Sequence, residues 1–195
     1  MDEHEARERI LTAAEELFYT HGLQTVGMAN IRQASGVSLK RLYQCFPSKE
    51  DLIDSYLNRR DQHWHQALTE HVDRYRSGRQ RLLAVFDFLT DWFAAPDFRG
   101  CAFINAFGEL GAVSTPVAAI ARSHKHTLRA RLRELATEAE AEDAEALAGQ
   151  LLVLVEGAIV TASMQDFPQC AGEHTKTAAQ TLIDTQFGPQ HRACR

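Results

Sequence analysis

The sequence lacks the features of a secreted or membrane-spanning protein. No run approaches the length of about 18 apolar residues that marks a membrane-spanning helix. The amino terminus, MDEHEARERI, is charged and acidic, whereas a signal peptide has a basic start and an apolar core. The cysteines stand far apart without a C-x-x-C pair; they are Cys45, Cys101, Cys170 and Cys194. These absences predict a cytoplasmic protein with reduced thiols, without disulfides, a zinc site or a membrane span.

Signatures of catalysis and of metal binding are missing as well. The sequence has no G-x-S-x-G, no H-E-x-x-H and no phosphate-cradling glycine loop. Histidines occur as His63-x-His65 and His124-x-His126, but on a helix the side chains within each pair diverge by about 200°. Neither pair is therefore expected to hold a metal ion by itself. We predict no enzyme, no cofactor and no metal site.

The sequence does contain helical periodicity over most of its length. Apolar residues recur three and four positions apart, and no segment has the alternating pattern of a strand. Caps and breaks at Gly22, Ser38, Pro47, Ser48 and Pro116 divide the pattern. We predict an all-α chain of about nine helices. The first helix ends at His21, and the other eight cover residues 28–34, 38–45, 49–76, 79–95, 101–110, 116–139, 141–164 and 173–187.

One stretch differs from the rest in charge. The chain has a formal net charge of −5, and nine acidic residues fall within 1–16 and 50–54, yet none falls within 17–49. The same stretch holds the basic residues Arg32, Lys40, Arg41 and Lys49. A solvated surface normally mixes both signs, whereas a surface against the phosphates of DNA gains from Lys and Arg and is repelled at each carboxylate. The pattern indicates that this stretch binds nucleic acid.

The spacing of this stretch adds a geometry. Two short helices separated by a three- or four-residue turn at Gly36 form a helix-turn-helix, whose second helix enters the major groove. Lys40 and Arg41 carry long donors that can reach guanine, and Gln44 can address adenine. The Tyr43 hydroxyl can reach a phosphate. Lys49 lies at a helix amino terminus, where the backbone amides also favour an anion.

Short motifs follow one another in order through residues 9–57: A-x-x-L-F, then HG, Ile31 with ASGVS, the pair Leu42–Tyr43, and FPSKEDLI. Together they resemble the DNA-binding domain of the tetracycline-repressor (TetR) family of bacterial transcription regulators. The resemblance implies a two-domain, all-α homodimer. Residues 1–57 would bind DNA, helix four (about 49–76) would link the domains, and residues 58–195 would bind an effector and dimerise.

The chain departs from the family pattern at Gly27, where Ser or Thr often contacts phosphate, so that only the backbone amide of Gly27 is expected to serve. Leu39 has two readings, as a packing residue or as a contact to a thymine methyl group. The predicted DNA-binding residues are Gly27, Ser38, Leu39, Lys40, Arg41, Tyr43, Gln44 and Lys49.

The helix predicted over 141–164 is apolar around much of its circumference, and a helix of this kind must be covered on more than one side. We predict that the domain core covers one side and a second copy of the chain covers the other. The alternative is a central helix in a monomer. The candidate dimer residues are Leu147, Leu151, Leu154, Ala158, Ala162 and Leu182.

Aromatic side chains crowd into residues 86–107, and rings with few polar neighbours suit a small apolar or aromatic effector. The candidate pocket residues are Phe86, Leu89, Trp92, Phe93, Phe103, Asn105, Phe107, Glu109 and Glu156. A role in the core is the alternative for each of them. Cys101 likewise has two readings, as a buried thiol or as a sensor of redox state or electrophiles.

These observations predict a dimeric transcriptional repressor that a small, largely apolar effector releases from a pseudo-palindromic duplex operator. The alternatives are a helical small-molecule-binding or catalytic protein, an activator, or a thiol-based sensor built on the same domain. The sequence specifies neither the effector, the operator nor the regulated genes.

Overall fold

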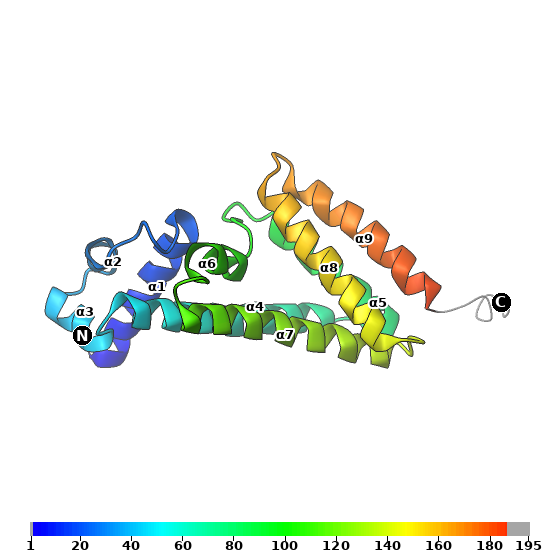
Figure 1. Ribbon diagram of the computed structural model, residues 1–195, viewed down its shortest axis with the longest axis horizontal. Coiled ribbons are helices and arrows are strands. Elements are labelled where there is room, and N and C mark those ends of the chain that lie inside the picture. Colours follow the sequence, from blue (N-terminus) through cyan, green and yellow to red (C-terminus); the bar gives the residue numbers. More distant parts are fainter. Residues whose placement is uncertain (1, 187–195) are drawn as a thin grey trace. The chain divides into compact units, whose positions relative to one another are not determined.

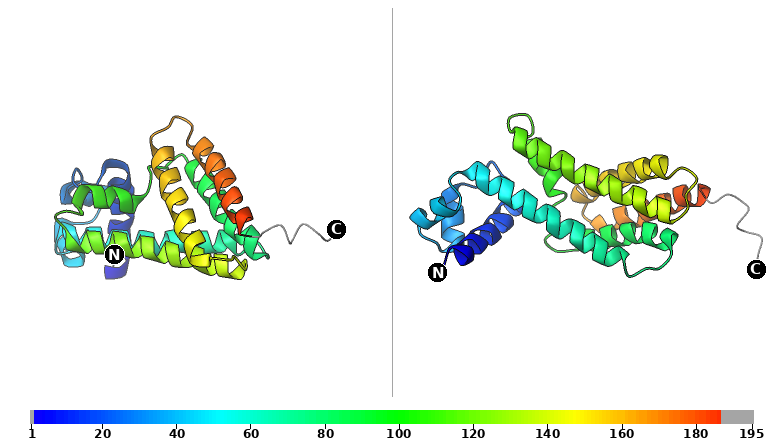
Figure 2. Two further views of the ribbon diagram at one scale, coloured as in Figure 1. Left: turned by 45° about the vertical axis from the view of Figure 1, so that its right-hand side comes forward. Right: turned by 90° about the horizontal axis from the view of Figure 1, so that it is seen from below.

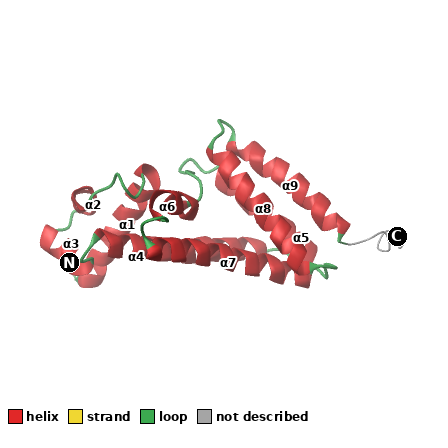
Figure 3. Cartoon of the chain, viewed as in Figure 1, coloured by secondary structure: helices red, strands yellow, loops and turns green. Residues whose placement is uncertain are grey.

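The computed structural model describes residues 2–186, and all regular secondary structure within them is α-helical (Figure 3). This confirms the all-α prediction. The helices are α1 (Glu3–His21), α2 (Met28–Ser35), α3 (Leu39–Cys45), α4 (Lys49–Val72), α5 (Gly78–Phe93), α6 (Ala102–Leu110), α7 (Thr115–Glu138), α8 (Ala144–Ser163) and α9 (Pro168–Thr185).

Helix starts follow the capping residues in the sequence. The Ser38 hydroxyl accepts a hydrogen bond from the Arg41 amide at the start of α3. At the start of α4, the Ser48 hydroxyl accepts from the Asp51 amide at 3.0 Å and donates to the Asp51 carboxylate at 2.7 Å. The contacts from the Arg41 and Asp51 amides satisfy donors that have no partner inside their own helix.

Two predicted boundaries are wrong by several residues. Helix α9 begins at Pro168 instead of residue 173, because proline suits the first turn of a helix, where the missing N–H is not needed. Helix α4 ends at Val72 instead of residue 76, and the chain turns before Ser77 caps α5. The predicted last residue of helix nine, Phe187, lies outside the described residues.

Contacts divide the chain into two compact units. The first contains the chain up to Trp64 together with residues 101–124, and the second contains residues 65–100 and the chain from Lys125 onward. Both boundaries fall inside long helices, α4 and α7. Helix α6 thus belongs with the helix-turn-helix, although it follows α5 in sequence.

The first unit packs α2 and α3 against α1 (Figure 1). Phe18 of α1 contacts Tyr56 of α4, with ring centroids 5.5 Å apart. The fully buried side chains of this unit include Ile10, Ile31, Leu42, Phe46, Leu52 and Leu57. These are the apolar residues at helical spacing in the sequence, so the short helices are held in place mainly by their buried faces.

In the second unit, α5, α8 and α9 lie side by side (Figure 2). Helix α9 approaches α5 closely at Gly172, where an added Cβ would lie 2.4 Å from Oγ1 and 2.9 Å from Cα of Thr90. Only glycine fits that contact without a shift of one helix. The core residues of this unit include Leu82, Phe86, Leu89, Leu147, Leu151, Val155, Ala179 and Ile183.

Candidate DNA-binding surface and effector-binding residues

A three-residue turn orients α3 relative to α2. Gly36 ends α2 in the left-handed conformation with φ 67°, and its amide donates to the Arg32 carbonyl at 3.1 Å. A side chain here would be strained by the backbone, and its Cβ would lie 3.0 Å from the Arg9 guanidinium. Ser38 then starts α3. The helix-turn-helix geometry predicted from the sequence is present.

Helix α3 is buried on one side and exposed on the other. Leu42 and Cys45 face the core, and Lys40 and Gln44 face solvent. Leu39 and Tyr43 are 52% and 46% exposed, which is high for large apolar side chains. Within residues 2–186 the side chains of Lys40, Tyr43 and Gln44 take part in no hydrogen bond or ion pair. Their donors are therefore available to an external partner.

Arg7 of α1 holds the carboxy-terminal end of α3. Its guanidinium donates to the Cys45 carbonyl at 3.0 Å and lies over the Phe46 ring, 4.3 Å from the centroid. The contact satisfies one of the carbonyls left open at a helix end and adds a cation–π interaction. The role of Arg7 is not predictable from the sequence, because nothing local in the sequence pairs residue 7 with residue 45.

Two predicted phosphate contacts have internal partners. The Gly27 amide donates to Asn30 Oδ1 at 2.9 Å, so it caps α2 and does not point freely outward. Lys49 Nζ donates to the Gln24 carbonyl at 3.3 Å. The Gly27 amide is therefore already hydrogen-bonded. Lys49 retains its positive charge, and one of its N–H groups is bound to the loop between α1 and α2.

Two of the acidic residues of α1 are paired with arginines of α4. Glu8 lies 3.3 Å from Arg59, and Glu15 lies 3.2 Å from Arg60. These ion pairs neutralise carboxylates that belong to the same unit as α3. The charge separation seen in the sequence thus persists in the fold, and the exposed side of α3 carries no acid.

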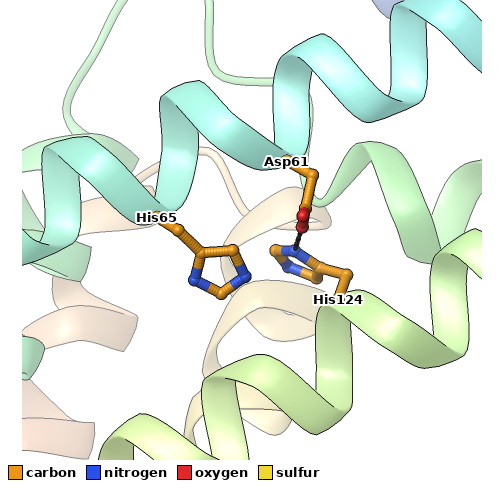
Figure 4. A group of neighbouring side chains, drawn as sticks. All are labelled: Asp61, His65 and His124. Atoms are coloured by element: carbon orange, nitrogen blue, oxygen red, sulfur yellow. Dashed lines mark hydrogen bonds and ion pairs between the residues drawn. The ribbon is translucent and has the colours of Figure 1, made fainter.

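The aromatic residues predicted for the effector pocket fall into different surroundings. In the first unit, Phe103 stacks on His124 with ring centroids 3.8 Å apart, and His124 Nδ1 lies 2.7 Å from Asp61 Oδ1 (Figure 4). Phe107 is 45% exposed, with the Arg122 guanidinium 5.8 Å from its ring centroid. Asn105 is also exposed.

Glu109 serves the helix-turn-helix domain. Its carboxylate accepts the Gln24 amide at 2.8 Å, and its backbone carbonyl accepts Gln24 Nε2 at 2.6 Å. Both carboxylate oxygens also lie against Gly22. The sequence predicts Glu109 as an anchor for an effector; in the structure its carboxylate and carbonyl bind Gln24, so the end of α6 holds the loop between α1 and α2.

In the second unit, Phe86, Leu89 and Phe93 are 0%, 1% and 2% exposed and belong to the core. Trp92 packs edge-on against Phe98, with centroids 5.1 Å apart. Glu156 is half-buried in α8: Oε2 pairs with Lys125 Nζ at 2.8 Å, and Oε1 is buried without a hydrogen-bond partner among the described residues. Glu156 remains a candidate polar anchor for an effector. Phe86, Leu89 and Phe93 pack in the core.

The candidate dimer residues are mostly inside the protomer. Four of them are buried, namely Leu147, Leu151, Ala158 and Ala162, and Leu154 and Leu182 are half-buried. The exposed side of α8 carries other residues one and two turns apart: Ala146, Gln150, Val153, Gly157, Val160 and Met164. Val153 and Met164 are 72% and 80% exposed. The apolar face that lacks a cover is therefore this one, which we name the α8 stripe.

Among the described helices, α8 is the one whose length and composition would suffice to cross a membrane. It packs along α5 and α9, as the core helix of a globular domain does. The sequence contains no comparably apolar run elsewhere, so its hydropathy is explained by one face in the core and by the α8 stripe.

The cysteines of the described residues differ in exposure, and the candidate sensor Cys101 is one of the buried ones. Cys45 and Cys101 are buried, 7% and 4% exposed, and Cys170 is exposed. Cys194 lies outside the described residues. Burial keeps Cys101 from solvent oxidants, and the residue begins α6 as its cap position.

Comparison with known families agrees with this geometry. The model described as "Bacterial regulatory proteins, tetR family" matches residues 10–56, and "Tetracyclin repressor-like, C-terminal domain" matches residues 78–178. The chain belongs to the TetR family. The match covers the helix-turn-helix and more than half of the chain beyond it.

The similar proteins are transcriptional regulators as well. The regulator SCO4454 of Streptomyces coelicolor superposes with a TM-score of 0.89 at 27% identity, covering 95% of this chain and 97% of that one. A putative TetR regulator of Streptomyces avermitilis has a TM-score of 0.81 at 32% identity, covering 93% and 98%. The transcriptional regulator YjdC of Escherichia coli K12 is 24% identical over 156 residues, 78% of this chain and 81% of YjdC.

The chain is therefore a DNA-binding transcriptional regulator with a carboxy-terminal ligand-binding domain. TetR-family members are regulatory proteins and not enzymes, and they bind operator DNA, typically as homodimers.

Proposed function

We propose that the chain is a cytoplasmic homodimeric repressor that a small, largely apolar effector releases from a pseudo-palindromic operator. The observation that carries this proposal is the exposed side of α3, whose polar side chains have no partner within the described residues. A donor-rich helix face without acids suits the edges and phosphates of duplex DNA.

The residues of α3 divide into two roles. Lys40 and Arg41 are long donors for guanine, and Gln44 has the amide that pairs with adenine. Leu39 is exposed and not packed, which favours contact with a thymine methyl group over a role in the core. Tyr43 donates to phosphate. With these roles, Leu39, Lys40, Arg41 and Gln44 of α3 would read bases, and Tyr43 would contact the DNA backbone.

Dimerisation by the α8 stripe supports the two-fold operator. Val153 and Val160 are exposed apolar residues, and an added Cβ at Gly157 or Gly149 would meet nothing within 4 Å. A depression of about 630 Å³ lies along the same face, lined by Arg129, Asp143, Glu145, Ala146, Gly149, Gln150 and Val153. Apolar and small residues beside a hollow suit the side chains of a second copy.

The effector is expected to be mostly apolar, because the chain around the predicted pocket is aromatic. Glu156, with one carboxylate oxygen paired and the other without a hydrogen-bond partner among the described residues, would provide a polar anchor. A ligand that binds one arrangement of the helices more tightly would shift the population toward it and lower operator affinity.

Activation of transcription is a second candidate. The activator FasR of Mycolicibacterium smegmatis is 35% identical over 89 residues, which is 44% of this chain and 41% of FasR. A reporter gene behind the chain's own upstream region separates the two roles: deletion of the regulator raises expression if it represses and lowers expression if it activates.

Fluorescence anisotropy on upstream duplex DNA at several salt concentrations tests the DNA-binding role. We expect salt-weakened, sequence-selective binding, and a loss of about 1–3 kcal/mol for Lys40→Ala and for Arg41→Ala. Arg76→Ala removes an exposed positive charge in the turn after α4 and serves as the matched control. Equal affinity of both α3 variants and the wild type would contradict the assignment of α3 as the reading helix.

A further inference from the structure

One histidine from each H-x-H pair lies beside the same carboxylate. Asp61 and His65 belong to α4, one helical turn apart, and His124 belongs to α7 (Figure 4). One ligand atom from each of the three side chains lies within 4.8 Å of the other two. The pairs fail as metal sites when taken separately, because their members diverge, but one member of each pair meets Asp61.

We propose that Asp61, His65 and His124 bind a divalent transition-metal ion, with Zn²⁺ as the reference ion. Two imidazoles and one carboxylate are a donor set that Zn²⁺ accepts as three protein ligands, with a fourth position open to water or a ligand. Imidazole nitrogen also suits Ni²⁺, Co²⁺ and Cu²⁺, whereas Mg²⁺ and Ca²⁺ prefer oxygen. The donor set therefore selects the class of ion.

The surroundings of His124 hold its ring ready for a ligand. The side chain is 2% exposed, Phe103 stacks on one face at 3.8 Å between centroids, and Trp64 approaches edge-on at 5.1 Å. A ring packed in this way loses little further entropy on binding an ion. His124 Nδ1 lies 2.7 Å from Asp61 Oδ1, so two of the proposed ligand atoms already point at the same place.

The helix spacing of the other two ligands also suits chelation. Positions four apart on an α-helix point the same way, so Asp61 and His65 present their side chains along one face of α4. Ligand atoms around a tetrahedral Zn²⁺ lie about 3.3 Å apart. The three proposed ligand atoms lie within 4.8 Å of one another, which exceeds that spacing by no more than about 1.5 Å.

The competing interpretation is an ion pair of Asp61 with His124 that needs no third residue. A pair of this kind does not depend on His65, whereas metal binding requires all three side chains. The chain itself offers matched controls: His63 and His126 are the exposed partners of His65 and His124 in the two H-x-H pairs.

Isothermal titration of the full-length, tag-free protein with Zn²⁺ tests the proposal, with Co²⁺ absorption as a second probe of imidazole coordination. We expect one ion per protomer and an affinity at least about tenfold weaker in Asp61→Asn and in His65→Ala. The variants His63→Ala and His126→Ala should retain the wild-type affinity. Because His124 is buried, His124→Asn is compared only if its circular dichroism and melting match those of the wild type.

Saturating Zn²⁺ should also raise the melting temperature of the wild type and of both controls, and should raise that of His65→Ala by less. Absence of binding, or equal loss in His63→Ala and His65→Ala, would overturn the site. These measurements contain no DNA, so they are independent of the proposed repressor function. A protein that binds its operator but no Zn²⁺ would refute this site and leave the regulator intact.

Discussion

Helices α3 and α8 each bury one face in the protomer and expose the other, and the exposed faces differ in chemistry. Helix α3 exposes Lys40 and Gln44, and α8 exposes Val153 and Gly157. The charged face suits a polyanion, and the apolar face with small residues suits close packing of another protein surface. The two exposed faces thus indicate two kinds of partner, because one face is charged and the other is apolar.

The largest effect is expected from a charge introduced on the exposed apolar face of α8, at Val153. We expect Val153→Glu to weaken self-association by about 3 kcal/mol, on the order of 100-fold, because it would bury an unpaired carboxylate in the dimer contact. Sedimentation equilibrium measures the change. Val113→Glu places the same charge on an exposed valine, 82% exposed, in the first unit and should leave association unchanged. Dimers of equal strength in both variants would remove the α8 stripe from the interface.

Two glycines of the second unit test which helix faces are packed within the protomer. Gly172→Ala should lower the free energy of unfolding by about 1–3 kcal/mol, because the new Cβ would meet Thr90 at 2.4 Å and 2.9 Å. Gly157→Ala meets nothing within 4 Å and should raise the stability of the protomer by about 0.5–1 kcal/mol through helix propensity. Urea unfolding at one protein concentration compares them, and equal effects would contradict the packing of α9 on α5.

The support of α3 is expected to show a smaller effect. Arg7→Ala removes the hydrogen bond to Cys45 and the contact with the Phe46 ring, at a cost of about 1–2 kcal/mol. Hydrogen exchange should rise first in the α3 amides, because that helix end loses its tie. Arg7→Lys keeps the positive charge without the planar guanidinium, so its stability should lie between those of the wild type and Arg7→Ala. Unchanged exchange in α3 would show that Arg7 does not hold it.

The smallest expected effect concerns a carboxylate. Partial burial, together with Asp51 and Glu50, raises the pKa of Asp54 above its usual value. A raised acid pKa disfavours the ionised form in the fold, so the cost is present above that pKa and is relieved as the pH falls through it. Asp54→Asn should therefore stabilise the protein at pH 7 by no more than about 0.5 kcal/mol, and less at pH 4. Thermal melts at both pH values measure the difference.

Local features of the fold were predictable from the sequence. The caps at Ser38 and Ser48 and the turn at Gly36 depend on neighbours within a few residues, so their roles were visible in the sequence alone. The division of charge around residues 17–49 was likewise visible and identified the DNA-binding stretch.

Contacts between distant segments were not predictable. Glu109 was assigned to an effector because its neighbours in sequence are aromatic, yet its partner is Gln24, 85 residues away. Arg7 contacts Cys45, and Asp61 meets His124, for the same reason. Helical periodicity identifies which side of α8 is apolar but cannot distinguish the side covered by α5 and α9 from the side left open, so Leu147 and Leu151 were expected at the dimer contact and lie in the core.

The hydrogen bonds between Glu109 and Gln24 have a consequence that a genetic screen can detect. These hydrogen bonds join the end of α6 to the loop between α1 and α2, so we expect changes there to alter the response to an inducer while α3 keeps its contacts with DNA. We expect a screen for strains that stay silent in the presence of inducer to return changes at Gln24 and Glu109. Residues of α3 should appear instead among strains that are always on.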